Sequence, residues 1–329
     1  MNDTELIFDK FSGKKVLVLG DIMIDEYIRG SVERISPEAP VPIVKLGQRE
    51  FRIGGAGNVA MNLKGLGAIP ILCSVIGKDS ASKELINLLN KNNISAEGII
   101  QSESRITTVK TRIVANNQQV VRIDNEININ LNDSEEIAFL NCFKEIINHG
   151  IDAVIYEDYN KGTLTKNIIE NTLSICKELH IATAVDPKKN NFLNYIGVTI
   201  FKPNFKELKE GLNIDQLQPN NWDSLELALS QLSKRLNHDI SLLTMSENGV
   251  YIKDKKDSYH IKAHVRDISD VSGAGDTVIA TAVMCYITGA SLQLIGEISN
   301  IAGGMVCELS GVARISIDSL RNECKRLKV

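Results

Sequence analysis

A chain of 329 residues with 43% hydrophobic content is long enough to bury a large core, and its formal net charge is −4. This acidic balance argues against nucleic acid or an anionic membrane as the main partner, and no uncharged apolar run approaches the roughly 20 residues of a membrane-spanning helix. The six cysteines include no CxxC pair, which is typical of reduced thiols, and residues 1–15 contain no apolar core of a secretion signal. These features predict a cytoplasmic protein.

Short apolar runs alternate with helix-length segments along most of the chain, beginning with a buried strand at Lys15–Gly20. Two helices are expected at 56–66 and 80–89, with a strand at 69–75 between them. Further strands are expected at residues 151–158, 181–186, 198–204 and 240–245. This alternation predicts a doubly wound α/β fold with a mostly parallel sheet, as a single domain over residues 1–329.

Polar residues follow the expected strands at their carboxyl ends, where doubly wound folds bind their ligands. These residues are Asp21, Asp158, Asp186, Asn204 and Ser246. We therefore expect the functional site at this rim of the sheet.

Two segments, at about 25–51 and 105–124, break the alternation. The first holds three of the seven prolines within Ser-Pro-Glu-Ala-Pro-Val-Pro at 36–42, and the second has the pattern of a β-hairpin around Asn116 and Asn117. We expect both to form a small separate sheet that covers the strand ends as a lid. Because so small a sheet has an exposed edge, we also expect a homodimer in which two lids pair.

The sequence Val-Ser-Gly-Ala-Gly-Asp at 271–276 combines a turn, the start of an apolar helix and an acid. Gly273 and Gly275 leave backbone N–H groups free to face an anion, and a helix start favours negative charge. Asp276 therefore places a proton acceptor beside an anion-binding turn, and phosphoryl transfer to an alcohol needs these two features together. No Walker A sequence is present, which excludes a P-loop enzyme.

Gly-Gly-Ala-Gly-Asn at 54–58 and Asp-Val-Ser-Gly-Ala-Gly-Asp at 270–276 resemble, in order and spacing, the two signature motifs of the ribokinase/PfkB carbohydrate kinases. The resemblance covers essentially the whole chain. Within that family, Arg-Ile-Ser-Pro-Glu-Ala-Pro-Val-Pro at 34–42 and Asp-Pro-Lys at 186–188 look like the D-glycero-β-D-manno-heptose-7-phosphate kinases. Some relatives carry a nucleotidyltransferase domain after the kinase, which we do not expect in a chain that ends at Val329.

The resemblance implies a ribokinase-like fold and an ATP-dependent, magnesium-requiring kinase. Its expected substrate is the heptose 7-phosphate, phosphorylated on the anomeric hydroxyl to the 1,7-bisphosphate for ADP-heptose and lipopolysaccharide core biosynthesis. Two alternatives stay open: another sugar or nucleoside kinase of the family, and a non-catalytic relative that senses a sugar nucleotide. The intact Asp276 argues against the second. A nicotinamide-dependent oxidoreductase is set aside, because no GxGxxG follows the first strand.

The resemblance also implies roles for individual residues. The general base is Asp276, and the anion hole is formed by Gly273, Ala274 and Gly275. The sugar hydroxyls are assigned to Asp21, Gly54, Gly55 and Asn58. The nucleotide is assigned to Asn204, Glu207, Thr244, Ser246, Gly249 and Asn300, with Glu207 acting indirectly on Mg²⁺. Asp270 and Ser272 mark a monovalent cation site, for K⁺, as in ribokinase relatives. Ser246 departs from the family pattern, which has glycine there.

A substrate that already carries a phosphate needs cations at its far end. Arg122 on the expected hairpin is the first choice, because a planar guanidinium suits a dianion. Lys161 and Lys188 follow strand ends at the same rim. Each of these can also be a solvated surface residue, as can Lys110 and Arg112.

The other motifs have structural alternatives too. The glycine pair at 54–55 can serve only helix–strand packing. Asp276 can cap its helix, although Ser272 is an adequate cap candidate. Asn204 and Glu207 can simply open a helix.

Overall fold

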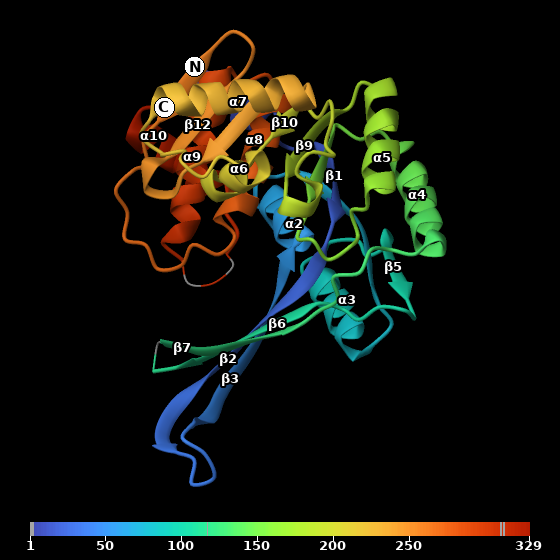
Figure 1. Ribbon diagram of the computed structural model, residues 1–329, viewed down its shortest axis with the longest axis vertical. Helices are drawn as coiled ribbons and strands as arrows, with labels where there is room; N and C mark the ends of the chain where they lie inside the picture. The colour runs from blue at the N-terminus through green and yellow to red at the C-terminus, as the bar shows by residue number, and fades with distance from the viewer. Residues whose placement is uncertain (1–2, 117, 310, 312) are drawn as a thin grey trace.

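The computed structural model describes residues 3–116, 118–309, 311 and 313–329; Asn117, in the expected hairpin turn, lies outside these residues. The described chain forms two sheets, one of nine strands flanked by helices and a separate one of four strands (Figure 1). The four-stranded sheet projects from the body as an extended arm.

The large sheet has the strand order β13-β12-β11-β10-β9-β8-β1-β4-β5. Neighbouring strands are parallel from β11 to β5, and β12 and β13 are antiparallel. The strands are β1 (Lys15–Gly20), β4 (Ile69–Gly77), β5 (Ile99–Ser102), β8 (Ala153–Glu157), β9 (Ala182–Asp186), β10 (Ile200–Phe201), β11 (Ile240–Thr244), β12 (Val250–Lys253) and β13 (Ser258–Ile261). The predicted doubly wound, mostly parallel sheet is thereby confirmed.

Alternate residues of β1 belong to two different hydrophobic cores, one on each face of the sheet. Val16 and Val18 pack in the first core, and Leu17 and Leu19 pack in the second; all four are fully buried. Each large apolar side chain removed from water contributes about 1.5–3 kcal/mol to the stability of the fold, so β1 stabilises the sheet from both of its faces.

The helices divide between these two cores. The first core contains residues of α1 (Asp3–Asp9), α2 (Ala56–Gly65), α3 (Ser80–Lys91), α8 (Ala274–Ile287), α9 (Leu292–Cys307) and α10 (Ile317–Leu327). The second contains residues of α4 (Asp133–Ile147), α5 (Lys166–Glu178), α6 (Phe205–Leu212) and α7 (Trp222–Leu236). Two 3₁₀ turns, η1 (Lys189–Asn191) and η2 (Ser246–Asn248), complete the elements. No helix in the described part of the chain is both long and apolar enough to cross a membrane.

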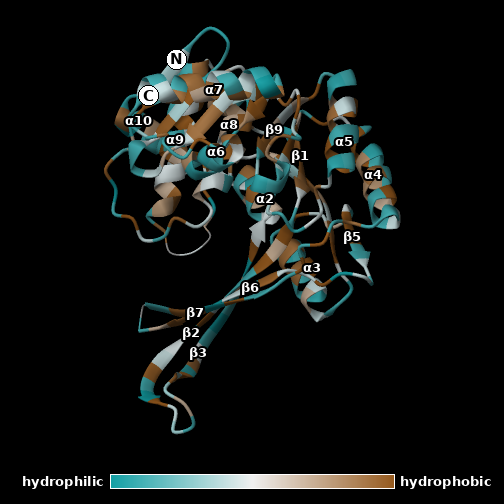
Figure 2. Cartoon of the chain, in the orientation of Figure 1, coloured by the Kyte–Doolittle hydropathy of each residue, from teal (hydrophilic) through white to brown (hydrophobic). Residues whose placement is uncertain are grey.

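The four-stranded sheet, called the lid below, has the order β3-β2-β6-β7. Its strands are β2 (Ile22–Ile35), β3 (Pro42–Gly55), β6 (Val109–Ala115) and β7 (Gln118–Asn125). Hydrophilic and hydrophobic residues are mixed along all of them (Figure 2). Only Asp21 separates β1 from β2, so the lid continues directly from an interior strand of the large sheet. The predicted small sheet is confirmed, but β3 runs on to Gly55, because its pairing with β2 extends as far as Ile22.

Candidate active site

The predicted base, Asp276, lies in the first turn of α8 and is 4% exposed. The helix begins after Gly273, whose φ of 82° is in the left-handed region and whose position has no side-chain cap. The expected cap, Ser272, therefore does not cap this helix; its backbone N–H instead donates to Asp270. Among the described residues, no side chain caps the first turn of α8 and competes there with an incoming anion, although the N–H of Ala274 donates to the carbonyl oxygen of Val271 at 3.3 Å.

Two side chains donate hydrogen bonds to Asp276. Nδ2 of Asn58 lies 2.6 Å from Oδ2, and the hydroxyl of Tyr159 lies 3.2 Å from Oδ1. Burial raises the pKa of Asp276 to about 6, an effect that the Asn58 hydrogen bond opposes and the negative charge of Asp186 reinforces. A carboxyl with a pKa of about 6 is ionised near neutral pH and is still basic enough to accept a proton in a reaction.

A buried acidic cluster lies beside the base. Oxygens of Glu157, Asp186 and Asp276 lie within 4.8 Å of one another. Glu157 is fully buried, and within the described residues both of its carboxylate oxygens lack a hydrogen-bond partner. The same holds for Oδ1 of Asp186, whose nearest cation is Nζ of Lys188 at 3.7 Å. Burial and the nearby Asp186 raise the pKa of Glu157 well above its usual value. Unpartnered carboxylate oxygens in such a group fit a divalent cation, which prefers oxygen ligands.

Lys202 supplies positive charge to this cluster from inside the protein. It is 1% exposed and its Nζ lies 2.8 Å from Oδ2 of Asp186. Burial alone would raise the pKa of Asp186, but the charges of Lys188 and Lys202 outweigh it and hold that pKa below its usual value. Sequence reasoning missed Lys202, although it directly follows β10 at the rim.

Glu157 was also missed, in favour of Asp158. The Asp158 carboxylate points away from the cluster and accepts hydrogen bonds from Tyr195, at 2.8 Å, and Asn191, at 3.0 Å. Consecutive strand residues face opposite sides of a sheet, so only one of two adjacent acids can reach the site. Both faces of this sheet are buried, and the local pattern therefore does not say which acid faces the site.

The two glycines before α2 allow close packing against the start of β2. A Cβ atom on Gly54 would clash with Oδ2 of Asp25, and one on Gly55, where φ is 59°, would clash with the carbonyl oxygen of Asp21. The packing alternative therefore accounts for part of this motif. Gly54 also leaves room for a carboxylate directly beside the start of α2.

That carboxylate belongs to Asp25 and not to Asp21, which the resemblance had assigned to the sugar. Asp21 is 3% exposed, and its oxygens accept hydrogen bonds from the backbone N–H groups of Tyr159, Lys161 and Thr163 at 2.9–3.2 Å. It therefore anchors the loop after β8. Asp25, on β2, forms an ion pair with Arg112 of β6. The signal in the sequence was the second acid of Gly-Asp-Ile-Met-Ile-Asp at 20–25.

On the side of the predicted nucleotide, Asn204 and Glu207 form a capping box at the start of α6. Oδ1 of Asn204 accepts from the N–H of Glu207, and Oε2 of Glu207 accepts from the N–H of Asn204, each at 2.8 Å. Asn204 thus has the helix-capping role of the structural alternative, and its contact with a nucleotide stays a prediction. Glu207 does more, because its Oε1 also binds Nζ of Lys188 at 2.5 Å, next to the acidic cluster.

The other predicted nucleotide contacts lie on neighbouring elements. Thr244 ends β11 and forms a bridge with Asn204. Ser246 has a φ of 50° and Gly249 a φ of 80°, so the turn after β11 keeps a left-handed backbone although serine replaces the expected glycine. Asn300, on α9, donates to the carbonyl oxygen of Lys262 at 2.9 Å.

Asp270 and Ser272, the predicted cation site, lie in the loop before α8. The carboxylate of Asp270 accepts backbone hydrogen bonds from Ser272, at 2.9 Å, and from Gly311, at 3.1 Å. Burial would raise the pKa of Asp270, but these hydrogen bonds outweigh it and lower that pKa. No oxygen of Asp270 is left unpartnered in the described structure, so the site for K⁺ stays a prediction from the resemblance.

The three cations predicted to bind the substrate phosphate differ in whether their side chains reach the site. Lys188 reaches the site, with its Nζ 5.4 Å from the centre of the Tyr159 ring. The Lys161 side chain turns to Glu126, at 2.6 Å. Arg122 lies on β7 directly opposite Arg112 of β6, is half exposed, and binds Asp124 through two hydrogen bonds of 2.9 Å. Its guanidinium is therefore already paired with a carboxylate of its own strand.

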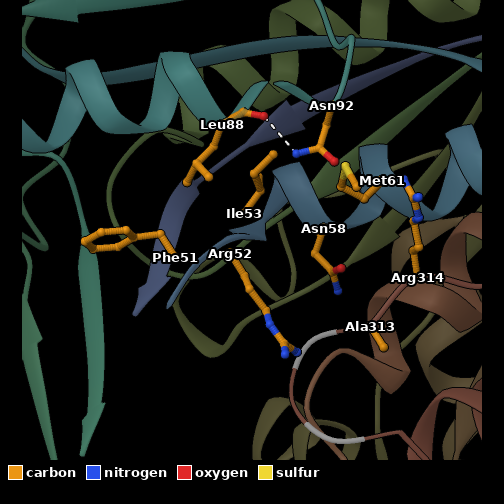
Figure 3. A pocket seen from close by; sticks show the side chains of 9 residues that line it. All are labelled: Phe51, Arg52, Ile53, Asn58, Met61, Leu88, Asn92, Ala313 and Arg314. Carbon is orange, nitrogen blue, oxygen red and sulfur yellow. Dashed lines mark hydrogen bonds between the residues drawn. The ribbon is translucent and has the colours of Figure 1, made fainter. Parts of the chain in front are cut away.

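A hollow of about 220 Å³ lies between the base of the lid and the body. Figure 3 shows Asn58, Arg52 and Arg314 among its lining residues, with Leu88 of α3 and Asn92, which follows that helix, on one side. Because Asn58 also binds Asp276, one wall of this hollow is in direct contact with the base.

Comparison with known proteins agrees with this architecture. Residues 13–319 match the family described as "pfkB family carbohydrate kinase". The chain is similar to curated proteins named "Bifunctional protein HldE": 36% identical over 311 residues to that of Mesorhizobium japonicum, 38% over 307 residues to that of Sulfurimonas denitrificans and 36% over 307 residues to that of Helicobacter pylori. These alignments cover 93–94% of this chain but only 62–66% of the relatives. The chain therefore spans less than two thirds of their length.

Two solved structures share the fold. Phosphofructokinase-2 from Escherichia coli, in complex with fructose-6-phosphate, has a TM-score of 0.78 and 17% identity, covering 97% of this chain and 100% of that one. Ribokinase from Arabidopsis thaliana, complexed with ribose and ATP, has a TM-score of 0.73 and 14% identity, covering 95% and 99%. The predicted ribokinase-like fold is confirmed. With a family match over nearly its whole length and relatives more than a third identical, the chain belongs to the pfkB family of carbohydrate kinases.

Proposed function

We propose that this protein transfers the terminal phosphoryl group of ATP to the anomeric hydroxyl of D-glycero-β-D-manno-heptose 7-phosphate, for ADP-heptose and lipopolysaccharide core biosynthesis. The observation that carries the phosphotransfer is the buried carboxylate of Asp276 in the uncapped first turn of α8. The choice of sugar rests on the segments at 34–42 and 186–188 and on the similarity to the HldE proteins. We place the reaction in the cytoplasm, in keeping with the free state of all six cysteines.

In the proposed reaction, Asp276 accepts the proton of the anomeric hydroxyl as that oxygen attacks the terminal phosphorus of ATP. The new O–P bond forms while the bond from that phosphorus to the bridging oxygen breaks, and ADP leaves. We assign the charge that develops on the transferred group to the N–H groups of the predicted anion hole at Gly273, Ala274 and Gly275, of which that of Ala274 donates to the carbonyl oxygen of Val271 at 3.3 Å in this structure. Gly275 suits this role, because a Cβ there would stand within 3.4 Å of the buried pair Asp186 and Lys202.

We assign magnesium to the acidic cluster. The oxygens of Glu157 and Asp186 that accept no hydrogen bond within the described residues fit a hard divalent ion, and Glu207 acts at a distance through Lys188. When bound, the ion neutralises negative charge on the phosphates of ATP. The protein's own contribution is to hold these carboxylates fixed, which Lys202 does for Asp186.

We further propose a homodimer formed through the lid. The strands β3 and β7 are the two edges of the small sheet. Large apolar side chains on the lid are exposed by 45–62%, namely Ile35, Leu46, Val41, Val121 and Ile123. Pairing of two lids would cover edges and apolar surface together.

The test is release of ADP across a panel of sugars: the heptose 7-phosphate, the unphosphorylated heptose, fructose 6-phosphate and ribose. We expect the highest kcat/KM with the heptose 7-phosphate and a product with a second phosphate at the anomeric carbon, identified by ³¹P NMR. A clear preference for an unphosphorylated sugar contradicts the assignment and favours another kinase of the family. Tight binding of a sugar nucleotide without ADP release favours a sensor.

A further inference from the structure

One face of the lid carries a row of charged residues, and the pairing of its strands shows which residues form this row. Asp25 on β2 is the direct partner of Lys110 on β6, and Lys110 is the direct partner of Asp124 on β7. Directly paired residues place their side chains on the same face of a sheet. Nζ of Lys110 lies 5.5 Å from the centre of the Tyr159 ring, so this face is the one that looks toward the base.

Lys110 differs from the other cations near the site. The two carboxylates beside it are already bound by arginines: Asp25 by Arg112, and Asp124 by Arg122. Within the described part of the chain, no carboxylate lies within 4.0 Å of the Lys110 ammonium, whereas other lysines around the site bind acidic partners, as Lys161, Lys188 and Lys202 do.

The surroundings of Lys110 disfavour a charged ammonium. Burial lowers the pKa of Lys110 and the charge of Lys161 lowers it further, against the weaker attraction of Glu126, Asp124 and Asp25. An anion placed here would stabilise the ammonium and reverse this effect. The position is therefore arranged for a negative charge that the described protein residues do not supply.

Tyr159 connects this ammonium to the chemistry. Its hydroxyl donates to Oδ1 of Asp276 at 3.2 Å, while its ring lies beside Lys110. These two contacts leave a path along Tyr159 from the base toward the lid, which a sugar can follow when its reacting hydroxyl meets Asp276. The phosphoryl group in transfer meets the sugar at the Asp276 end of this path, and Lys110 lies at the other end.

We propose that the ammonium of Lys110 binds the phosphate monoester carried by the acceptor sugar and thereby selects phosphorylated over unphosphorylated sugars. This inference rests on the proposed function. It replaces Arg122, which lies on the same lid face but whose guanidinium is half exposed and bound to Asp124. A competing location is the hollow that Asn58 and the exposed Arg314 line together.

The experiment compares Lys110→Met with Lys110→Arg, and uses Lys45→Met, an exposed lysine of the same lid, as the matched control. For Lys110→Met we expect KM for the heptose 7-phosphate to rise about ten- to a hundredfold, the range for loss of one charge-assisted contact. KM for the unphosphorylated heptose and for ATP should change less than about threefold. Lys110→Arg should regain part of the preference, and Lys45→Met should match the wild type.

Three outcomes overturn the inference. If Lys110→Met raises KM equally for the phosphorylated and the unphosphorylated heptose, Lys110 does not select for the phosphate. A fall in kcat for both sugars, with KM unchanged, places Lys110 at the group in transfer instead. A loss of preference in Arg122→Gln or Arg314→Gln, but not in Lys110→Met, moves the phosphate to one of those arginines. Circular dichroism of each variant confirms that it is folded.

Direct binding separates this inference from the proposed function. If the wild type does not phosphorylate the heptose 7-phosphate, the proposed function fails, and calorimetry with glucose 6-phosphate, fructose 6-phosphate and the heptose 7-phosphate tests Lys110 alone. A Kd that rises tenfold or more in Lys110→Met supports the inference. An unchanged Kd overturns it, as does a wild type that binds none of these sugar monophosphates.

Discussion

Nδ2 of Asn58 donates a hydrogen bond to Oδ2 of Asp276 at 2.6 Å, joining the starts of α2 and α8 across 218 positions of the sequence. Both side chains are buried, at 2% and 4% exposure. A hydrogen bond donated to a carboxylate favours its charged form, whereas burial favours the neutral one. The contact therefore limits the rise of the Asp276 pKa to about 6, and the two glycine-rich segments jointly set the protonation state of the base.

Replacing Asn58 with leucine should raise the pKa of Asp276, because burial then acts with one opposing donor fewer. As a base, Asp276 works only when deprotonated, so kcat/KM should fall as the pH drops below its pKa. In the wild type we expect this fall at about pH 6, and in Asn58→Leu at higher pH. The pH dependence of kcat/KM measures it. Tyr159→Phe removes the longer hydrogen bond and should give a smaller shift in the same direction; a fall at unchanged pH in both variants would contradict this account.

Asp276→Asn keeps the size of the side chain and removes the proton acceptor. We expect turnover to fall by roughly 10²–10⁴, with the Kd for ATP little changed. Steady-state turnover and a nucleotide-binding titration measure the two effects. Wild-type turnover in this variant would exclude Asp276 as the base.

Asp21→Asn should act on stability more than on substrate binding. The carboxylate accepts hydrogen bonds from three backbone N–H groups, and the introduced NH₂ cannot replace it as an acceptor for all of them. We expect the free energy of unfolding to fall by about 2–4 kcal/mol, measured by urea denaturation. Sugar KM should rise in Asp25→Asn and stay near the wild-type value in Asp21→Asn. The reverse pattern would return the sugar-binding role to Asp21.

Lys202→Met removes the closer of two cationic partners of the buried Asp186 carboxylate, and leaves Lys188 at 3.7 Å from Oδ1. Breaking a buried ion pair completely costs about 3–5 kcal/mol, so urea unfolding should show a loss that approaches this range, reduced by the charge of Lys188. Lys206→Met is the matched control: its ion pair with Glu210 is exposed, with 3.7 Å between the charged atoms, and such pairs contribute about 0.3–0.5 kcal/mol. Equal stability of the two variants would show that Lys202 does not stabilise Asp186.

If two copies associate through their lids, the mass measured by sedimentation should increase with protein concentration. Val121 and Ile123 are exposed by 45% and 53% on the edge strand β7. We expect the wild type to sediment as a dimer at micromolar concentration and the double variant Val121→Lys, Ile123→Lys to sediment as a monomer, because charge on an edge opposes pairing. A wild type that stays monomeric throughout this range would refute the lid dimer.

Much of the fold followed from local pattern. The apolar run Lys15–Gly20 is β1 with the same bounds, and the irregular segments around 25–51 and 105–124 do form a sheet of their own. Hydrophobic periodicity and turn residues are local properties, and for that reason the amino-acid sequence determined them by itself. The position of Asp276 at the start of a buried helix was predictable for the same reason, since the glycines before it and the apolar helix after it are adjacent in the chain.

The choice among neighbouring polar residues was decided only in three dimensions. Of the adjacent acids Glu157 and Asp158, Glu157 is the one that faces the acidic cluster. Of Lys110 and Arg112, which lie two residues apart on one face of β6, Lys110 is the one without a carboxylate partner in the described structure. Strand alternation gives the relative orientation of such residues but not which face meets the site, because both faces of a parallel sheet are buried. Ion pairs between distant segments then decide which charges remain for a ligand, and no local pattern contains that information.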